Sequence, residues 1–191
     1  CTNIDFRKRL SEEAFGLTAY YETLISNYFN NYNNNIFPNK KIVCGNLIET
    51  LRYGENPHQK AAIYSSKNKL GILQLNGKKL SYNNYNDIFS ALNLSKMLPK
   101  NIGTVIIKHT NPCGVSINKN KINSYKEAYA SDPISAFGGI VLCNFKVSHK
   151  LAIEMNKSFI EVIIGVGFDN DALKILKKKK NLRIIDSSKF N

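Results

Sequence analysis

The sequence predicts an α/β fold, layered α/β/α, in which helices cover a mostly parallel sheet. From residue 104 onward, short apolar runs alternate with amphipathic stretches of helical period, which is the pattern of strands joined by covering helices. The apolar runs are rich in Val and Ile, as buried strands are. The chain has 191 residues and is 43% hydrophobic and 21% charged, so it can bury one sizeable core.

The first element is a long helix over about residues 3–29, with Asp5 in its first turn. Its apolar residues recur every three or four positions: Phe6, Leu10, Ala14, Leu17, Tyr21, Leu24 and Tyr28. An Asn-rich stretch over residues 30–35 follows and predicts a linker or surface loop. Such a helix has little to pack on, so we expect a further domain upstream of it.

The remaining elements follow in order. Two short strands are expected over 47–52 and 61–64, around the turn-rich residues 53–59, and a polar loop over 75–84 leads to a helix over 86–97. The alternating part then has expected strands and helices at 104–108 (strand), 123–129 (helix), 139–143 (strand), 148–156 (helix), 159–164 (strand), 171–180 (helix) and 182–185 (strand).

The charge balance leaves the class of partner open. Lys and Arg number 27 against 14 acidic residues, a formal charge of +13. A basic nucleic-acid-binding module without catalysis is one interpretation, and a phosphorylated small substrate is another. The lysines are dispersed apart from residues 177–180, and no zinc-finger or aromatic RNA-binding signature accompanies them. This dispersal favours a solvated lysine-rich surface.

Nothing in the sequence indicates export or a membrane. No apolar run approaches the roughly 18 residues of a membrane span, and the first residues lack the core of a signal peptide. The chain lacks an initiator Met, so we expect it to begin inside a longer protein. The cysteines, Cys1, Cys44, Cys113 and Cys143, form no paired motif, which favours reduced thiols in a cytoplasmic protein.

Lys108 and His109 are the first candidates for catalysis. They end the apolar run 105–107, and ligands of open α/β sheets bind beside the carboxyl ends of strands. Histidine can accept a proton near neutral pH, and a lysine beside it can stabilise charge that develops on oxygen. The competing interpretation is a histidine that simply caps backbone at a strand end.

The Pro112-Cys113 turn raises the possibility of a zinc site, because zinc deaminases carry a Pro-Cys-x-x-Cys turn. Ser116 occupies the place of the second cysteine, and no His-x-Glu sequence is present. We therefore expect no metal.

Three further segments could bind a ligand. Arg52 suits bidentate recognition of phosphate or carboxylate, and Tyr53 could stack on a heterocycle, although an ordinary surface loop would look the same. Gly138 belongs to a Gly-Gly pair that lets a ligand approach the backbone, a common pattern before a strand. Glu161 lies inside an apolar run, where a carboxylate is costly unless it is paired or binds something.

Taken together, these segments closely resemble the bifunctional purine biosynthesis family of AICAR formyltransferase/IMP cyclohydrolases. Five motifs occur in the family's order and cover essentially the whole chain: residues 52–59, 75–84, 108–114, 131–139 and 160–164. Residues 171–183 fit the same family.

The resemblance implies a division of the chain. Residues 1–30 resemble the C-terminal helix of the cyclohydrolase domain, and residues 31–46 form a linker. Residues 47–191 resemble the first subdomain of the formyltransferase domain, which is similar in fold to cytidine deaminases. The catalytic residues of the cyclohydrolase and the second formyltransferase subdomain are then missing, so we expect these residues alone to be incomplete and inactive.

The resemblance also implies an activity. The family transfers a formyl group from 10-formyltetrahydrofolate, its co-substrate, to the 5-amino group of AICAR ribotide and cyclises the product to IMP. His109 matches the catalytic histidine and Lys108 the lysine that stabilises the transition state. The positions matching or near nucleotide contacts are Arg52, Tyr53, Gly138, Glu161, Asn83 and Asn84. A homodimer without nucleic acid, membrane or metal is implied.

Overall fold

The computed structural model describes residues 2–190, so Cys1 lies outside the described residues. The chain divides into two compact units. The first comprises Cys1–Ile48 with Tyr64–Asn68, and the second comprises Glu49–Ile63 with Lys69–Asn191. Each unit is described by itself.

The first unit is built on the long helix α1, Ile4–Tyr32. Its N-terminus is capped by Asn3, whose side chain accepts a hydrogen bond of 2.8 Å from the backbone N–H of Phe6. The predicted helix is confirmed, and it extends three residues further than 3–29, into the asparagine run, because the asparagines continue the helical hydrogen bonding.

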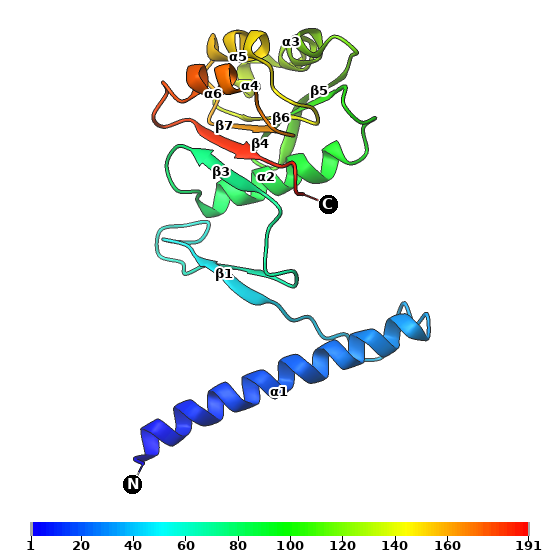
Figure 1. Ribbon diagram of the computed structural model, residues 1–191, viewed down its shortest axis with the longest axis vertical. Helices are drawn as coiled ribbons and strands as arrows, with labels where there is room; N and C mark the ends of the chain where they lie inside the picture. The colour runs from blue at the N-terminus through cyan, green and yellow to red at the C-terminus, as the bar shows by residue number, and fades with distance from the viewer. Residues whose placement is uncertain (1, 191) are drawn as a thin grey trace. The chain divides into compact units, whose positions relative to one another are not determined.

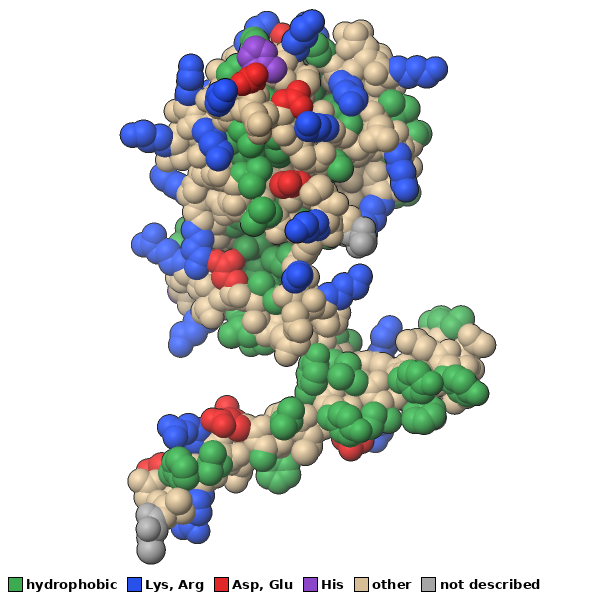
Figure 2. Space-filling model, in the orientation of Figure 1, with side chains coloured by type: hydrophobic (Ala, Val, Ile, Leu, Met, Phe, Trp, Pro, Cys, Tyr) green, Lys and Arg blue, Asp and Glu red, His purple; other side chains and the backbone are tan. Residues whose placement is uncertain are grey.

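Helix α1 is covered on one side only within its unit. Thr23 is buried, and the Asn27 side chain donates to the carbonyl of Ile42 at 3.3 Å, so the segment after the helix folds back along it. The apolar stripe predicted from the sequence is exposed, with Leu17 at 71% and Tyr21 at 61%. Figure 2 shows apolar side chains along the visible face of α1.

Two short strands follow α1. They are β1, Asn46–Thr50, and β2, Ala62–Ser65, which pair as a two-stranded sheet. Both were predicted, with bounds that differ by one or two residues.

The second unit contains a six-stranded sheet in the order β3-β8-β7-β6-β4-β5. Its strands are β3 (Leu73–Asn76), β4 (Gly103–Lys108), β5 (Asn111–Ile117), β6 (Ile140–Cys143), β7 (Val162–Gly165) and β8 (Arg183–Asp186). Only β6–β7 and β7–β8 pair in parallel, whereas β3–β8, β4–β6 and β4–β5 are antiparallel. The sheet is therefore mixed, and the prediction of a mostly parallel sheet was wrong.

Helices cover both faces of this sheet, as a layered α/β/α arrangement requires (Figure 1). The helices are α2 (Tyr82–Ser95), α3 (Lys121–Ser131), α4 (Pro133–Ala136), α5 (His149–Asn156) and α6 (Asn170–Leu176). Helix α2 lies on one face, and α3, α5 and α6 lie on the other. Alternate residues of β4 confirm this: Val105 and Ile107 pack with α2, and Ile106 packs with α3 and α5.

Three segments differ from the sequence prediction for identifiable reasons. The polar loop expected over 75–84 contains the end of β3 and the first turn of α2. Ser81 and Asn84 form a capping box, in which each side chain hydrogen-bonds the other residue's backbone N–H, so the helix starts four residues early. Helix α6 ends at Leu176 instead of continuing through the lysines to 180. Strand β7 starts at Val162, so Glu161 precedes the strand instead of lying in it.

Among the residues described, no helix is both long enough and apolar enough to cross a membrane. Cys44, Cys113 and Cys143 are free thiols.

Candidate functional site

Three of the candidate residues in the second unit lie at the same end of neighbouring strands of the sheet. Lys108 ends β4, while Gly138 and Glu161 precede β6 and β7. Because β4 runs antiparallel to β6, its carboxyl end lies beside the amino ends of β6, β7 and β8. The expectation of a site at carboxyl ends therefore holds for β4 alone, and the other strands contribute from their amino ends.

His109 lies in a two-residue turn between β4 and β5. Both His109 and Thr110 adopt positive φ, at 52° and 61°, and Lys108 pairs with Asn111 across the turn. Positive φ at both central positions is the geometry of a type I′ turn, which matches the twist of the two strands. This conformation is rare for a β-branched residue such as Thr110, so the turn is strained. It places His109 exposed at the tip of the hairpin.

The turn is fixed by hydrogen bonds from outside and inside. The backbone N–H of Thr110 donates to Oδ1 of Asp87, on α2, at 2.7 Å. The Asn111 side chain donates to the carbonyl of His109 at 2.9 Å. These two bonds use backbone atoms of Thr110 and His109 and do not involve the imidazole ring of His109.

The Pro112-Cys113-Gly114 segment, which the sequence presented as a turn, is the start of strand β5. Pro112 is tolerated because β5 is an edge strand, and Cys113 is the extra residue at an irregularity of the β4–β5 register. Gly114 is required because a Cβ there would lie 1.8 Å from the carbonyl oxygen of Ala128, on α3. The edge position of β5, its irregular register and its close contact with α3 therefore account for Pro112, Cys113 and Gly114, respectively.

Cys113 is a poor nucleophile in this setting. Burial, with a contribution from the negative charge of Asp132, raises the pKa of the Cys113 thiol. Among the described residues, no group of three or more His, Cys, Asp or Glu side chains is placed to hold a metal ion.

Phe137, the residue before Gly138, connects Lys108 to the Gly138 loop. The ammonium group of Lys108 donates to the carbonyl of Phe137 at 2.8 Å. Gly138 has a φ of +73°, and its N–H donates to the carbonyl of Phe159 at 2.9 Å. Asp132 caps the short helix α4 before this loop by accepting from the backbone N–H of Ser135, and hydrogen bonds from the side chain and the backbone of Ser135 lower the pKa of Asp132. The segment over residues 132–138 is thus fixed by the Asp132 cap at its start and by hydrogen bonds to Lys108 and Phe159 at its end.

Glu161 is the centre of a second set of bonds at the same edge. Its Oε1 accepts from Asn84 Nδ2 at 3.0 Å and from Arg183 Nη1 at 3.0 Å. Its backbone N–H donates to the carbonyl of Gly139 at 3.1 Å, which connects it to the Gly138 loop. Glu161 is therefore paired, as expected for a carboxylate beside a buried strand.

Three predicted residues are not tied to this cluster. Arg52 and Tyr53 lie in the loop after β1, where the guanidinium carbon of Arg52 lies 5.9 Å from the centroid of the Tyr53 ring. Asn83 is exposed on the first turn of α2. Within residues 2–190, no hydrogen bond or ion pair that the structure contains joins these three to Lys108 or Glu161.

Sequence reasoning missed two residues of the cluster, Asp87 and Arg183. Asp87 gave no signal, because an acidic residue on a helix is ordinary. Arg183 directly precedes the apolar pair Ile184-Ile185, just as Glu161 directly precedes Val162. In neighbouring parallel strands, charges of opposite sign at the same end predict an ion pair, and this signal could have been used.

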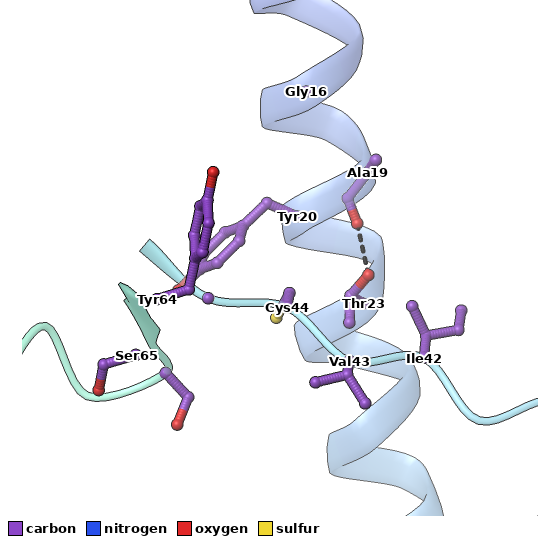
Figure 3. Close-up of a pocket in the computed structure, with 11 residues that line it drawn as sticks. Gly16, Ala19, Tyr20, Thr23, Ile42, Val43, Cys44, Tyr64 and Ser65 are labelled. Carbon is purple, nitrogen blue, oxygen red and sulfur yellow. Dashed lines mark hydrogen bonds between the residues drawn. The ribbon is translucent and has the colours of Figure 1, made fainter. Parts of the chain in front are cut away.

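A pocket in the first unit contains none of the predicted residues. It has a volume of about 680 Å³ and lies between α1 and two extended segments. Figure 3 shows Tyr20 and Thr23 of α1 facing Cys44 and Tyr64 across it. Its lining carries no Asp, Glu, His, Lys or Arg side chain.

On the face that Figure 2 shows, the positive charge of the second unit is not concentrated. Figure 2 shows Lys and Arg side chains dispersed over the visible face of the second unit, with acidic side chains among them. Such a surface lacks the continuous basic stripe that follows a nucleic-acid backbone.

Comparison with known proteins agrees with the sequence motifs. The model of the AICARFT/IMPCHase bienzyme family matches residues 1–191. A bifunctional purine biosynthesis protein PurH from Thermoanaerobacter sp. is 48% identical over 188 residues, which cover 96% of this chain and 37% of that protein. Proteins of the same name from Parvibaculum lavamentivorans and Listeria monocytogenes are 44% and 41% identical, each over 96% of this chain and over 35% and 37% of their own lengths.

The chain thus spans little more than a third of the length of these relatives. The match of the family model to every residue, together with these identities, shows that the chain belongs to the AICARFT/IMPCHase bienzyme family.

Proposed function

We propose that the second unit carries half of a formyltransferase site, which transfers a formyl group from 10-formyltetrahydrofolate to the 5-amino group of AICAR ribotide. The observation that carries this proposal is the joining of Lys108, Gly138 and Glu161 at one sheet edge, beside the turn that presents His109. Four residues that the family resemblance marks are thereby brought into one region from separate parts of the sequence.

The chemistry suits these side chains. The amino nitrogen of AICAR forms a bond to the formyl carbon, the bond from that carbon to N10 of the folate breaks, and N10 gains a proton. The attacking amine loses a proton, which His109 accepts as general base. The tetrahedral intermediate carries an oxyanion, which the Lys108 ammonium stabilises.

Lys108 can do this without leaving its present partner. An ammonium has three N–H donors, and the hydrogen bond to Phe137 uses one of them. The bond to Phe137 fixes the direction of the side chain, so that the remaining donors are held near the Gly138 loop.

The remaining assignments follow the family. In this proposal, Arg52, Tyr53, Gly138 and Glu161 bind the ribotide, and Asn83 lies near it. Residues 47–191 form the first, cytidine deaminase-like subdomain, residues 31–46 the linker, and residues 1–30 the closing helix of the cyclohydrolase domain, the region of α1. The complete protein then acts in the cytoplasm as a homodimer on two small-molecule substrates.

The proposal is tested with the complete protein that contains these 191 residues. Purified protein is incubated with AICAR ribotide and 10-formyltetrahydrofolate, and tetrahydrofolate release is followed by absorbance. Formyl transfer that depends on both substrates supports the proposal, and Lys108→Ala should lower kcat by roughly 100-fold because it removes the oxyanion donor. Absence of transfer by the unaltered protein would refute it.

A further inference from the structure

The Glu161 carboxylate is held from one side only. Both of its side-chain hydrogen bonds, from Asn84 and from Arg183, end on Oε1. Oε2 has no such partner among the residues that the structure describes, and the Glu161 side chain is 42% exposed. One oxygen is therefore occupied by the protein, and the other is free to accept a hydrogen bond from a ligand.

We infer that Arg183 is a positioning residue, which orients the carboxylate of Glu161 so that Oε2 accepts an N–H or O–H donor of the ribotide. This inference rests on the proposed function, because it takes Glu161 as a substrate-binding residue. It adds a residue whose contribution passes through Glu161 and involves no contact with the substrate.

The burial of Arg183 supports an indirect role. Its side chain is only 14% exposed, against 42% for its partner Glu161. The backbone N–H of Arg183 also donates to the backbone carbonyl of Glu161 at 3.1 Å. Arg183 therefore contacts both the main chain and the carboxylate of Glu161. The Arg183 side chain is therefore much less accessible to a ligand than the carboxylate that it contacts.

The free-energy cost of burying the Arg183 side chain also supports a positioning role. Arg183 Nε is buried without a hydrogen-bond partner in the described part of the chain. An unpaired buried donor destabilises the fold, and an ion pair with one partner as exposed as Glu161 contributes little to stability. The arrangement is therefore better suited to fixing the direction of Glu161 than to stabilising the sheet.

Asn84 is fixed in a way that supports the same geometry. Its Oδ1 accepts from the N–H and the hydroxyl of Ser81, in the capping box that starts α2. The amide nitrogen of Asn84 must then point away from Ser81, and it donates to Glu161. Asn84 is buried, and in this inference it acts on the ligand through Glu161.

The test compares five variants of the complete protein with the unaltered protein: Arg183→Gln, Arg183→Lys, Glu161→Gln, the double variant Glu161→Gln/Arg183→Gln, and Lys174→Gln. Lys174 forms an exposed ion pair with Asp171 outside the site and is the matched control. For each, kcat and KM are measured separately for the ribotide and the folate, together with the thermal unfolding midpoint.

A positioning role predicts a defined pattern. Arg183→Gln should raise KM for the ribotide about tenfold or more, with KM for the folate unchanged within about twofold. Arg183→Lys, which keeps a charged donor, should recover most of this loss. The double variant should bind the ribotide no worse than Glu161→Gln alone, because both changes remove the same contact. Lys174→Gln should leave all kinetic values unchanged.

Other outcomes separate the inference from the function on which it rests. If Glu161→Gln raises KM for the ribotide but Arg183→Gln lowers only the unfolding midpoint, the arginine is structural and the inference is wrong. The inference would also be wrong if the two substitutions raised KM for the ribotide by independent factors that multiply in the double variant. If the unaltered protein transfers no formyl group, or if Glu161→Gln binds the ribotide normally, the proposed function of the site fails and the inference fails with it.

Discussion

The backbone N–H of Thr110 donates a 2.7 Å hydrogen bond to Oδ1 of Asp87, so helix α2 holds the turn that carries His109. The same helix holds Glu161 through Asn84, one turn earlier. Neighbouring turns of α2 therefore hold both the His109 turn and Glu161, although these two parts of the candidate site lie more than 50 residues apart in the sequence.

Loss of the Asp87 carboxylate should loosen this turn. We expect Asp87→Ala to lower the free energy of unfolding by about 1 kcal/mol, because a charge-assisted hydrogen bond to backbone is lost. Displacement of His109 should lower kcat for formyl transfer by roughly tenfold or more. Asp171→Ala, which removes an exposed acid elsewhere on the unit, is the control for urea unfolding and activity. Equal behaviour of the two variants would show that the turn does not need Asp87.

The positive φ of Thr110 gives a second prediction. A non-glycine residue in this region stores roughly 1–3 kcal/mol of strain, and glycine has no such strain but loses about 0.5–1 kcal/mol through backbone entropy. Thr110→Gly should therefore stabilise the protein by about 1 kcal/mol in urea unfolding. Thr110→Ala keeps a Cβ and should not reach this gain. A Thr110→Gly protein less stable than Thr110→Ala would show that the turn is not strained.

Gly114 should tolerate no side chain. The Cβ of Gly114→Ala would lie 1.8 Å from the carbonyl oxygen of Ala128, so α3 must move away from β5. We expect a loss of about 3 kcal/mol, at the upper end of the range for overpacking. Gly16→Ala is the matched control, because a Cβ on that helical glycine meets nothing within 4 Å. It should stabilise its helix by up to about 1 kcal/mol. A mild effect at Gly114 would contradict the close packing of α3.

Glu49 gives a pH-dependent prediction. Burial acts to raise the pKa of this carboxyl, but hydrogen bonds from Tyr85 at 2.7 Å and from Lys79, with the lysine charge, outweigh it and lower the pKa below the ordinary 4.5. Above pH 4.5 the carboxylate is charged in both states, and its stabilising effect is complete. As the pH falls below this value, the unfolded chain takes up the proton first, so stability is lost until the pH passes the lower folded pKa.

Glu49→Gln removes this dependence. At pH 7 we expect the variant to be less stable by about 1 kcal/mol, because the buried hydroxyl of Tyr85 loses a charged acceptor. The difference from the unaltered protein should shrink steadily as urea unfolding is repeated from pH 5 downward. A difference that stayed constant or grew toward low pH would show that Glu49 is not stabilised as a carboxylate in the folded protein.

The spacing of hydrophobic residues along the sequence was sufficient to predict most of the helices and strands. The helix of α1, the strands β4, β6 and β8, and the helices α3 and α5 all occur where the sequence places them. These segments are governed by local spacing and by burial of one face, both of which the sequence displays.

Pairing direction was not predictable from the same patterns. Strand β5 begins with Asn111-Pro112, which looks like a turn, and its pairing depends on the strained His109-Thr110 conformation. The early start of α2 depends on a capping box that uses Asn84 in place of the usual Glu or Gln. Both features arise from contacts between particular side chains and backbone.

The candidate residues can be recognised in the sequence by type, but most of the contacts between them cannot. Lys108 and His109 are conspicuous because they end an apolar run, and Glu161 because it interrupts one. Asp87 and Arg183 have partners more than 20 residues away along the chain. The packing of α2 on the sheet brings Asp87 to Thr110, and the pairing of β7 with β8 brings Arg183 to Glu161.

The most direct test of the central claim is the formyl transfer rate of His109→Ala in the complete protein, beside His149→Ala as a matched exposed histidine. General-base catalysis contributes roughly 100- to 10,000-fold, so His109→Ala should lose formyl transfer by that factor while cyclisation of the formylated ribotide continues at its normal rate. His149→Ala should retain both activities. Formyl transfer by His109→Ala at the rate of the unaltered protein would contradict the assignment of this edge of the sheet as the reacting centre.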